Sequence, residues 1–135
     1  MERIGAPCGG GGPAATGKRP SLARANRQAA HVATSMRIAV ISDTHDRLPE
    51  SLPERLRGAE EIWHLGDVSL PATLAPLEAM GVPLQVVRGN CDWSAQWPES
   101  LELEREGHRF FLVHIPPWRV PKGLAAVLHG HTHVP

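Results

Sequence analysis

The residues MRIAVISDTH, numbered 36–45, contain the pattern from which the fold can be inferred. Residues 36–42 form a short apolar run with β-branched side chains, which is typical of a strand buried on both faces of a sheet. An aspartate, a threonine and a histidine follow this run at once. The segment therefore predicts a parallel strand with polar side chains at its carboxyl end, where α/β sheets gather their binding residues.

The same arrangement recurs along the chain. EIWHL (61–65) and LQVVR (84–88) are similar apolar runs, each followed by turn residues. SLPERLRG (51–58) and PATLAPLEAM (71–80) lie between the runs and predict helices, the second with a proline in its first turn. Strands that alternate with helices predict parallel β-α-β units.

The pattern changes after residue 99. SLELE (100–104) alternates apolar and polar residues, EGH (106–108) can turn, and RFFLVH (109–114) can return as an antiparallel partner. AVLHG (126–130) predicts a last strand. Together these elements predict an α/β domain over residues 36–135.

The composition is that of one ordinary globular domain. The chain has 135 residues, of which 41% are hydrophobic and 21% are charged. No apolar run approaches the roughly 20 residues that span a bilayer, and none has the form of a secretory signal, so we expect a soluble, cytoplasmic protein without membrane contact. Cys8 and Cys91 are too few and too far apart for a disulfide framework or a thiolate zinc cluster.

Residues 1–35 are expected to form a separate, disordered tail. They include the run GGGGPAATGKRP, show no hydrophobic period, and carry five basic side chains against one acidic side chain. The tail therefore has a net charge of +4, and residues 36–135 carry the balancing −4. Its composition is also that of an organellar transit peptide, while a start codon chosen too far upstream would make Met36 the first residue. We favour the second of these alternatives.

Polar side chains follow five of the predicted strands. Aspartate, asparagine and histidine supply oxygen and nitrogen donors, which suit Mn, Fe, Zn, Ni or Co rather than a thiolate-selective site. In an extended segment residues i and i+2 point the same way, so Asp43 with His45 and His131 with His133 are each expected to present a pair of ligands. One D-x-H alone is more often a cap or a turn. The five groups in chain order are Asp43-Thr44-His45, Gly66-Asp67, Gly89-Asn90-Cys91-Asp92, His114 and Gly130-His131-Thr132-His133.

The order D-x-H, G-D, G-N-x-D, H and G-H-x-H resembles the calcineurin-like metallophosphoesterases. The text MRIAVISDTH, IWHLGD, VVRGNCD and LHGHTHVP is similar to their small bacterial and archaeal phosphodiesterase branch. The resemblance covers residues 36–135 and implies a β-sandwich flanked by helices, with the C-terminal part of its second sheet missing here. It also implies two metal sites that share a bridging Asp67, the first held by Asp43, His45, Asp67 and His133 and the second by Asp67, Asn90, His114 and His131.

The function implied by this resemblance is binuclear, metal-dependent hydrolysis of a phosphodiester by a metal-bridged hydroxide, with Asp67, Asn90 and His114 as catalytic residues. The cofactors would be two divalent ions, with Mn favoured over Ni, Fe, Co and Zn. The expected partner is a small phosphodiester; nucleic acid would enter only as a substrate, and a homo-oligomer stays open. Two alternatives remain, namely a non-catalytic scaffold of the same fold, like a retromer subunit, and an inactive truncated fragment.

Several residues depart from the family pattern or have competing explanations. Many members have histidine where this chain has Cys91, so acidic leaving groups are the expected substrates and Cys91 is expected to be a small buried hydrophobe. Asp92 is expected to fix a ligand imidazole, with a turn cap as the equal alternative. His64 and His129 are expected to pack rather than bind metal.

The loops carry further candidates. Prolines at 116, 117 and 121 argue against a helix between His114 and the last strand. Three tryptophans could stack on a nucleobase or an aryl group, and ordinary loop packing is the equal alternative. Two arginines could contact phosphate. These loop residues are Trp93, Trp97, Trp118, Arg88 and Arg119.

Overall fold

The computed structural model describes residues 35–93 and 96–133, so residues 1–34 of the predicted tail lie outside the described residues. The described residues belong to one compact unit. Every strand and helix expected over residues 36–130 is present, although most are shorter than expected. In chain order they are β1 (Ile38–Ile41), α1 (Leu52–Arg55), β2 (Glu61–His64), the 3-10 helix η1 (Pro71–Leu74), α2 (Ala75–Glu78), β3 (Leu84–Val86), β4 (Ser100–Arg105), β5 (His108–Val113) and β6 (Ala126–His129).

The first sheet is parallel, with the strand order β1-β2-β3. All four residues of β2 are buried because neighbours cover both of its edges and both faces. The expectation that residues 36–42 are buried on both faces is wrong, since β1 is only half-buried and Val40 is 43% exposed. In the described part of the chain β1 lies at the edge of its sheet and hydrogen-bonds only to β2, which leaves one side of it open.

The second sheet has the order β4-β5-β6 and combines both directions. β4 and β5 pair antiparallel through a two-residue turn, Glu106 and Gly107, whose φ angles are 51° and 75°. Two positive φ angles match the twist of a tight hairpin. β5 and β6 pair in parallel, and the described crossover between them contains no helix, as the prolines predicted.

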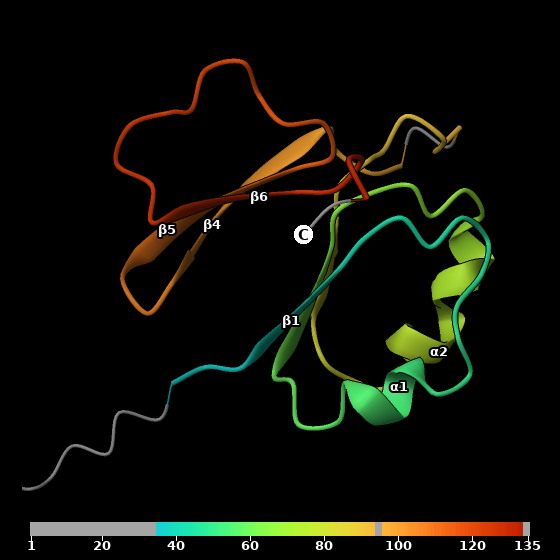
Figure 1. The fold of residues 1–135 in the computed structure, drawn as a ribbon. Helices are drawn as coiled ribbons and strands as arrows, with labels where there is room; N and C mark the ends of the chain where they lie inside the picture. The colour runs from blue at the N-terminus through green and yellow to red at the C-terminus, as the bar shows by residue number, and fades with distance from the viewer. Residues whose placement is uncertain (1–34, 94–95, 134–135) are drawn as a thin grey trace, which may run out of the picture. The chain divides into compact units, whose positions relative to one another are not determined.

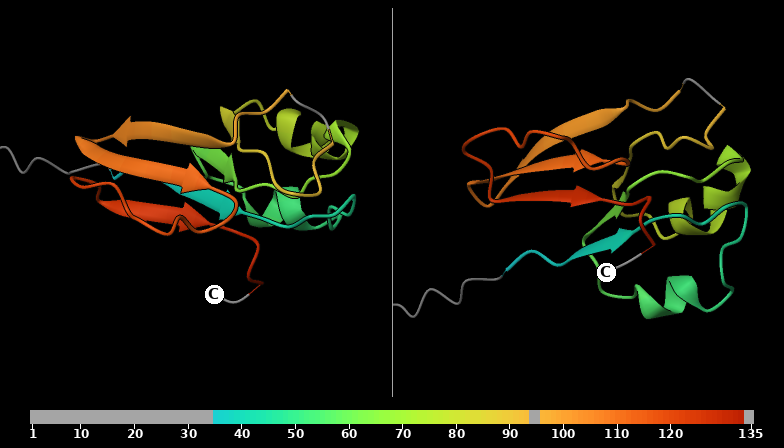
Figure 2. Two further views of the ribbon diagram at one scale, coloured as in Figure 1. Left: turned by 90° about the horizontal axis from the view of Figure 1, so that it is seen from above. Right: turned by 45° about the horizontal axis from the view of Figure 1, so that its top comes forward.

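The unit has three layers, namely the helices, the first sheet and the second sheet (Figures 1 and 2). Successive side chains of β2 point to opposite faces of the first sheet and so contact different layers. Ile62 packs with Leu74 and Leu77 of the helical layer, while Trp63 packs with Leu112 of the second sheet. Trp63 also meets Phe110 edge-on, with ring centroids 5.3 Å apart. The first sheet is therefore the middle layer, and each of its faces buries a separate apolar cluster. Among the described residues, no helix has the length and apolar character that crossing a membrane requires.

Strand direction determines where the loops gather. β1, β2 and β3 run in parallel, so the loops that follow them leave the sheet at the same edge. In the second sheet, β5 and β6 also run in parallel, and the backbone N–H of Gly130 donates to the carbonyl of His114 at 3.1 Å just beyond their ends. The five groups of polar residues predicted from the sequence therefore converge at one end of the unit.

Candidate metal centre

Backbone hydrogen bonds hold the loop after β1 against the loop after β2. The N–H groups of Asp43, His45 and Asp46 donate to the carbonyls of Gly66, Asp67 and Val68, at 3.0, 2.9 and 3.0 Å. The pairing continues the contact between the two strands beyond their ends. It brings the carboxylates and the imidazole of two separate motifs to one place before any side-chain contact is considered.

The backbone of these loops is left-handed rather than extended. Of the eight non-glycine residues with positive φ in the described chain, seven lie in these loops and one is Glu106 of the hairpin. The prediction that extended i and i+2 pairs present the ligands is therefore wrong, although the ligands still converge. Conformations of this kind are costly and cluster at functional sites. The seven are Asp43, His45, Asp46, Asp67, Ser69, His131 and His133.

Two glycines permit close approach between the loops. A Cβ at Gly89 would lie 2.1 Å from Oδ1 of Asp67, and a Cβ at Gly130 would lie 2.0 Å from Oγ of Ser42. Neither position has room for a side chain. Glycine at these points is what lets the third and fifth motifs reach the first two.

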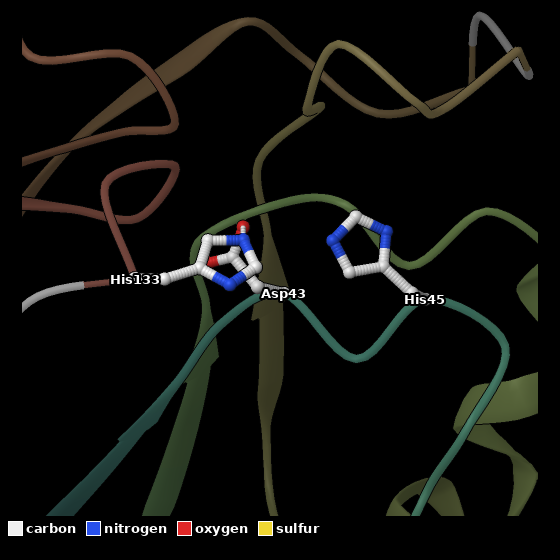
Figure 3. A group of neighbouring side chains, drawn as sticks. All are labelled: Asp43, His45 and His133. Carbon is white, nitrogen blue, oxygen red and sulfur yellow. Dashed lines mark ion pairs between the residues drawn. The ribbon is translucent and has the colours of Figure 1, made fainter.

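Three of the four ligands predicted for the first ion lie together. Asp43, His45 and His133 place one ligand atom each within 4.8 Å of one another, and Figure 3 shows the three side chains meeting from two loops. Nε2 of His133 lies 3.4 Å from Oδ1 of Asp43, and the two imidazole rings are 5.7 Å apart. The side chains of His45 and His133 are 40% and 60% exposed, so solutes can reach this set.

The second predicted set is also assembled and shares Asp67 with the first. Oδ2 of Asp67 lies 3.3 Å from Nε2 of His114 and 3.8 Å from Nε2 of His45. Oδ1 of Asn90 lies 2.9 Å from both Nε2 of His114 and Nδ1 of His131. Asp67 is thus the residue between the two sets, where the resemblance predicted a bridging ligand.

The hydrogen bond of His114 to a backbone carbonyl indicates what this cluster can bind. Nδ1 of His114 is 2.8 Å from the carbonyl oxygen of Leu65, an acceptor, so Nδ1 carries the proton. In the neutral ring, Nε2 then presents a lone pair to two further acceptors, the oxygens of Asp67 and Asn90. Three electron pairs that face one another without a shared proton form an arrangement that a cation stabilises, so the donor set fits a divalent metal.

Cys91 belongs to this site, which the sequence did not predict. Its thiol is partly exposed and forms a ligand-type group with His45 and Asp67, so the expectation of a buried hydrophobe is wrong. A hydrogen bond to Asp67, with partial burial and the charge of Asp67, raises the pKa of the Cys91 thiol. The neutral thiol is a weaker ligand than a thiolate.

Asp92 has partners other than those predicted. Its buried carboxylate accepts backbone N–H bonds from Asp67 at 3.0 Å, from Gly89 at 2.6 Å and from Ser69 at 2.7 Å. It contacts no imidazole in the described structure, so the cap alternative is the correct one. Asp92 ties the loop after β2 to the loop after β3 and thereby positions Asp67 through its backbone.

His64 is a buried core histidine, as predicted, but it also connects two loops. The N–H of Gly66 donates to its Nδ1 at 3.2 Å, so Nε2 carries the proton and donates to Oγ1 of Thr44 at 3.0 Å. Burial lowers the pKa of His64 to about 4, so the ring is neutral near pH 7. No sequence signal identified this link, because its two partners come from different motifs.

The remaining candidates are dispersed. His129 is exposed, so the expectation that it packs is wrong, and it belongs to none of the ligand groups found among the described residues. Trp97 packs against the apolar cluster of the helical layer, whereas Trp93 and Trp118 are 93% and 98% exposed. Arg88 forms an ion pair with Glu99.

The chain is similar in sequence to known proteins. A family model described as the calcineurin-like phosphoesterase superfamily domain matches residues 36–135. A probable metallophosphoesterase of Methanothermobacter thermautotrophicus is 34% identical over 118 residues, which cover 74% of this chain and 68% of that protein.

Solved structures are similar to this chain over a smaller share of its length. Vps29 of Entamoeba histolytica, a single mutant, matches with a TM-score of 0.58 at 22% identity over 72% of this chain and 64% of its own. Vps29 of Chaetomium thermophilum matches with a TM-score of 0.53 at 22% identity over 59% and 48%. A predicted phosphoesterase of Streptococcus pneumoniae is 30% identical over 57% and 44%, with a TM-score of 0.43. The chain therefore spans less than two thirds of each of these three structures, and the Vps29 matches bear on the fold alone.

Proposed function

This chain belongs to the calcineurin-like phosphoesterase superfamily, and on that premise we propose that it is a phosphodiesterase that uses two divalent metal ions. Asp43, His45 and His133 would hold the first ion, and Asn90, His114 and His131 the second, with Asp67 shared. The nitrogen and oxygen donors favour Mn, with Ni, Fe, Co or Zn as alternatives.

One observation carries the proposal, namely the convergence of acceptor atoms around His114. With Nδ1 protonated and the ring neutral, the oxygens of Asp67 and Asn90 approach the lone pair of Nε2 of His114 at 3.3 and 2.9 Å. The side chains of His114 and Asp67 are almost fully buried, so water cannot relieve the repulsion cheaply. A purely structural cluster would be expected to contain a donor at this point.

The residues around the ligands position them. The carbonyl of Leu65 orients the ring of His114, and the backbone N–H of Cys91 holds Oδ1 of Asp67 at 2.7 Å, which directs Oδ2 to the two histidines. When bound, two divalent ions would acidify the attacking water and neutralise the charge that develops on the phosphoryl group. The exposed His45 and His133 mark the side from which phosphate would enter.

The leaving group is constrained by Cys91. This position would have to supply a proton to a poor leaving group, and the raised pKa of the thiol makes it a weak acid near neutral pH. We therefore propose that the substrates are diesters with an acidic leaving group. This is also the expectation for the small phosphodiesterase branch.

The decisive experiment is hydrolysis of bis(p-nitrophenyl) phosphate. Turnover should appear with added Mn, disappear with a chelator and fall about a thousandfold in Asp67→Asn, because the bridging charge is lost. Glu54→Gln, an exposed change on α1, is the matched control and should keep full activity. A protein that binds no divalent ion at micromolar concentration in calorimetry would contradict the proposal.

A second candidate function is a non-catalytic scaffold of the same fold, which the sequence leaves open. A scaffold would show no metal-stimulated turnover in the unmodified protein. An inactive fragment differs from both, because it would fail to fold with or without Mn in circular dichroism.

A further inference from the structure

The hollows on the described surface include three of similar size, with volumes of about 320, 320 and 330 Å³. One of them is lined by Asn90 and His114, and the other two touch none of the seven predicted metal ligands. We name it the Asn90–Ile115 pocket; Val113, Ile115, Arg88 and Glu99 complete the part of its lining used below. Its position beside the second ligand set gives it a chemical context that the others lack.

The lining combines an apolar part with a neutral polar part. Val113 ends β5 and Ile115 follows His114; the Ile115 side chain is 52% exposed and adds apolar surface to the pocket. Arg88 and Glu99 form an ion pair, so together they offer donors and acceptors without net charge. The pocket therefore suits an uncharged group that has an apolar face and a hydrogen-bonding edge.

We propose that the Asn90–Ile115 pocket binds one ester arm of the phosphodiester and selects an uncharged arm with the chemistry of a nucleoside or an aryl alcohol. The inference rests on the proposed function, since it requires phosphate at the neighbouring ligands. A volume of about 320 Å³ is at the lower end of small-molecule sites and has room for one arm rather than a whole diester.

Glu99 has a specific part in this selection. Its carboxylate neutralises Arg88 and would repel a second phosphate on the arm. Because the side chain of Glu99 is 81% exposed, solvent weakens this effect, and we expect a discrimination of only a few-fold. The ion pair would thus admit a nucleoside 5′-phosphate more readily than its 3′,5′-bisphosphate.

Direct binding tests the proposal without relying on turnover. The Mn-loaded full chain is titrated in a calorimeter with methyl phosphate, phenyl phosphate and thymidine 5′-phosphate, each of which has one arm. Phenyl phosphate and thymidine 5′-phosphate should bind about tenfold more tightly than methyl phosphate. Tighter binding of the thymidine compound than of the phenyl compound identifies a nucleoside arm, and equal binding identifies an aryl arm.

Ile115→Arg should abolish the preference, because it fills the pocket and adds a charge. Val120→Arg is the matched control, since Val120 is 61% exposed and lies outside the lining. Equal binding of all three phosphates by the unmodified protein, or equal effects of the two variants, would overturn the proposal. Glu99→Gln should improve binding of thymidine 3′,5′-bisphosphate relative to the 5′-phosphate, and an unchanged ratio would overturn the role of Glu99.

Binding of inorganic phosphate distinguishes a failure of the pocket inference from a failure of the proposed function. If the Mn-loaded protein binds inorganic phosphate and hydrolyses bis(p-nitrophenyl) phosphate but shows no arm preference, the pocket inference is wrong and the proposed function stands. If it binds no inorganic phosphate and hydrolyses no ester, the proposed function is wrong as well.

Discussion

Two buried carboxylates at opposite ends of β2 are stabilised in different ways. Glu61 begins the strand, is 1% exposed, and receives two hydrogen bonds of 2.6 Å from Arg105 of β4. Asp67 follows the strand, is 3% exposed, and lies 3.8 and 3.3 Å from the imidazoles of His45 and His114, with no arginine or lysine partner in the described structure. One end contains its own cation and joins the two sheets; the other end is the proposed metal centre.

Removing the cation at the structural end should give the largest change in stability. Arg105→Ala leaves Glu61 buried without its partner, so the free energy of unfolding at pH 7 should fall by about 3 kcal/mol in urea titrations. Arg109→Ala breaks the half-exposed pair with Glu102 and should cost less than about 1 kcal/mol. Equal losses in the two variants would contradict the comparison, and Mn affinity should be unchanged in both.

Acid should reduce the contributions of His64 and Glu61 to stability in different pH ranges. The pKa of His64 is about 4 in the folded chain against 6.5 in the unfolded chain, so the unfolded state binds more protons between these values. Stability should therefore fall by up to about 3 kcal/mol as the pH drops from 6.5 to 4. Burial alone would raise the pKa of Glu61, but Arg105 holds it below 4.5, so its contribution is lost only at lower pH.

Urea titrations between pH 6.5 and 4, repeated with a His64 variant, test whether His64 causes the loss of stability in this range. His64→Gln removes the titrating ring and should flatten the loss between pH 6.5 and 4. His108→Gln changes an exposed histidine in β5 and should leave the profile as it is. An unaltered profile in His64→Gln would show that another group titrates there.

The sequence predicted the elements and the ligand groups because both depend on local pattern. The apolar run at 61–65 and the alternation at 100–104 are sufficient to predict β2 and β4, and strand direction brings the five motifs together. The contacts of His64 with Thr44 and of Asp92 with Asp67 were not predictable, because these partners lie 20 and 25 residues away and depend on how neighbouring loops approach. The left-handed backbone at Asp43 was missed for a related reason, since hydrophobic periodicity carries no information about the sign of φ.

Two glycine substitutions give the last comparison, and only the one in the β4–β5 hairpin should have a small effect. Gly107 has a φ of 75°, and no atom lies within 4 Å of the place that a Cβ would take, so Gly107→Ala should cost only about 1 kcal/mol of stability and leave Mn affinity unchanged. Gly89→Ala would instead place its methyl group against both Oδ1 and the backbone nitrogen of Asp67, so the backbone of these loops must shift, and both stability and Mn binding should fall. Calorimetry and urea titration of both variants separate the two costs. If Gly89→Ala keeps full Mn affinity, the position of Asp67 is less constrained than the contacts of Asp92 and Cys91 imply.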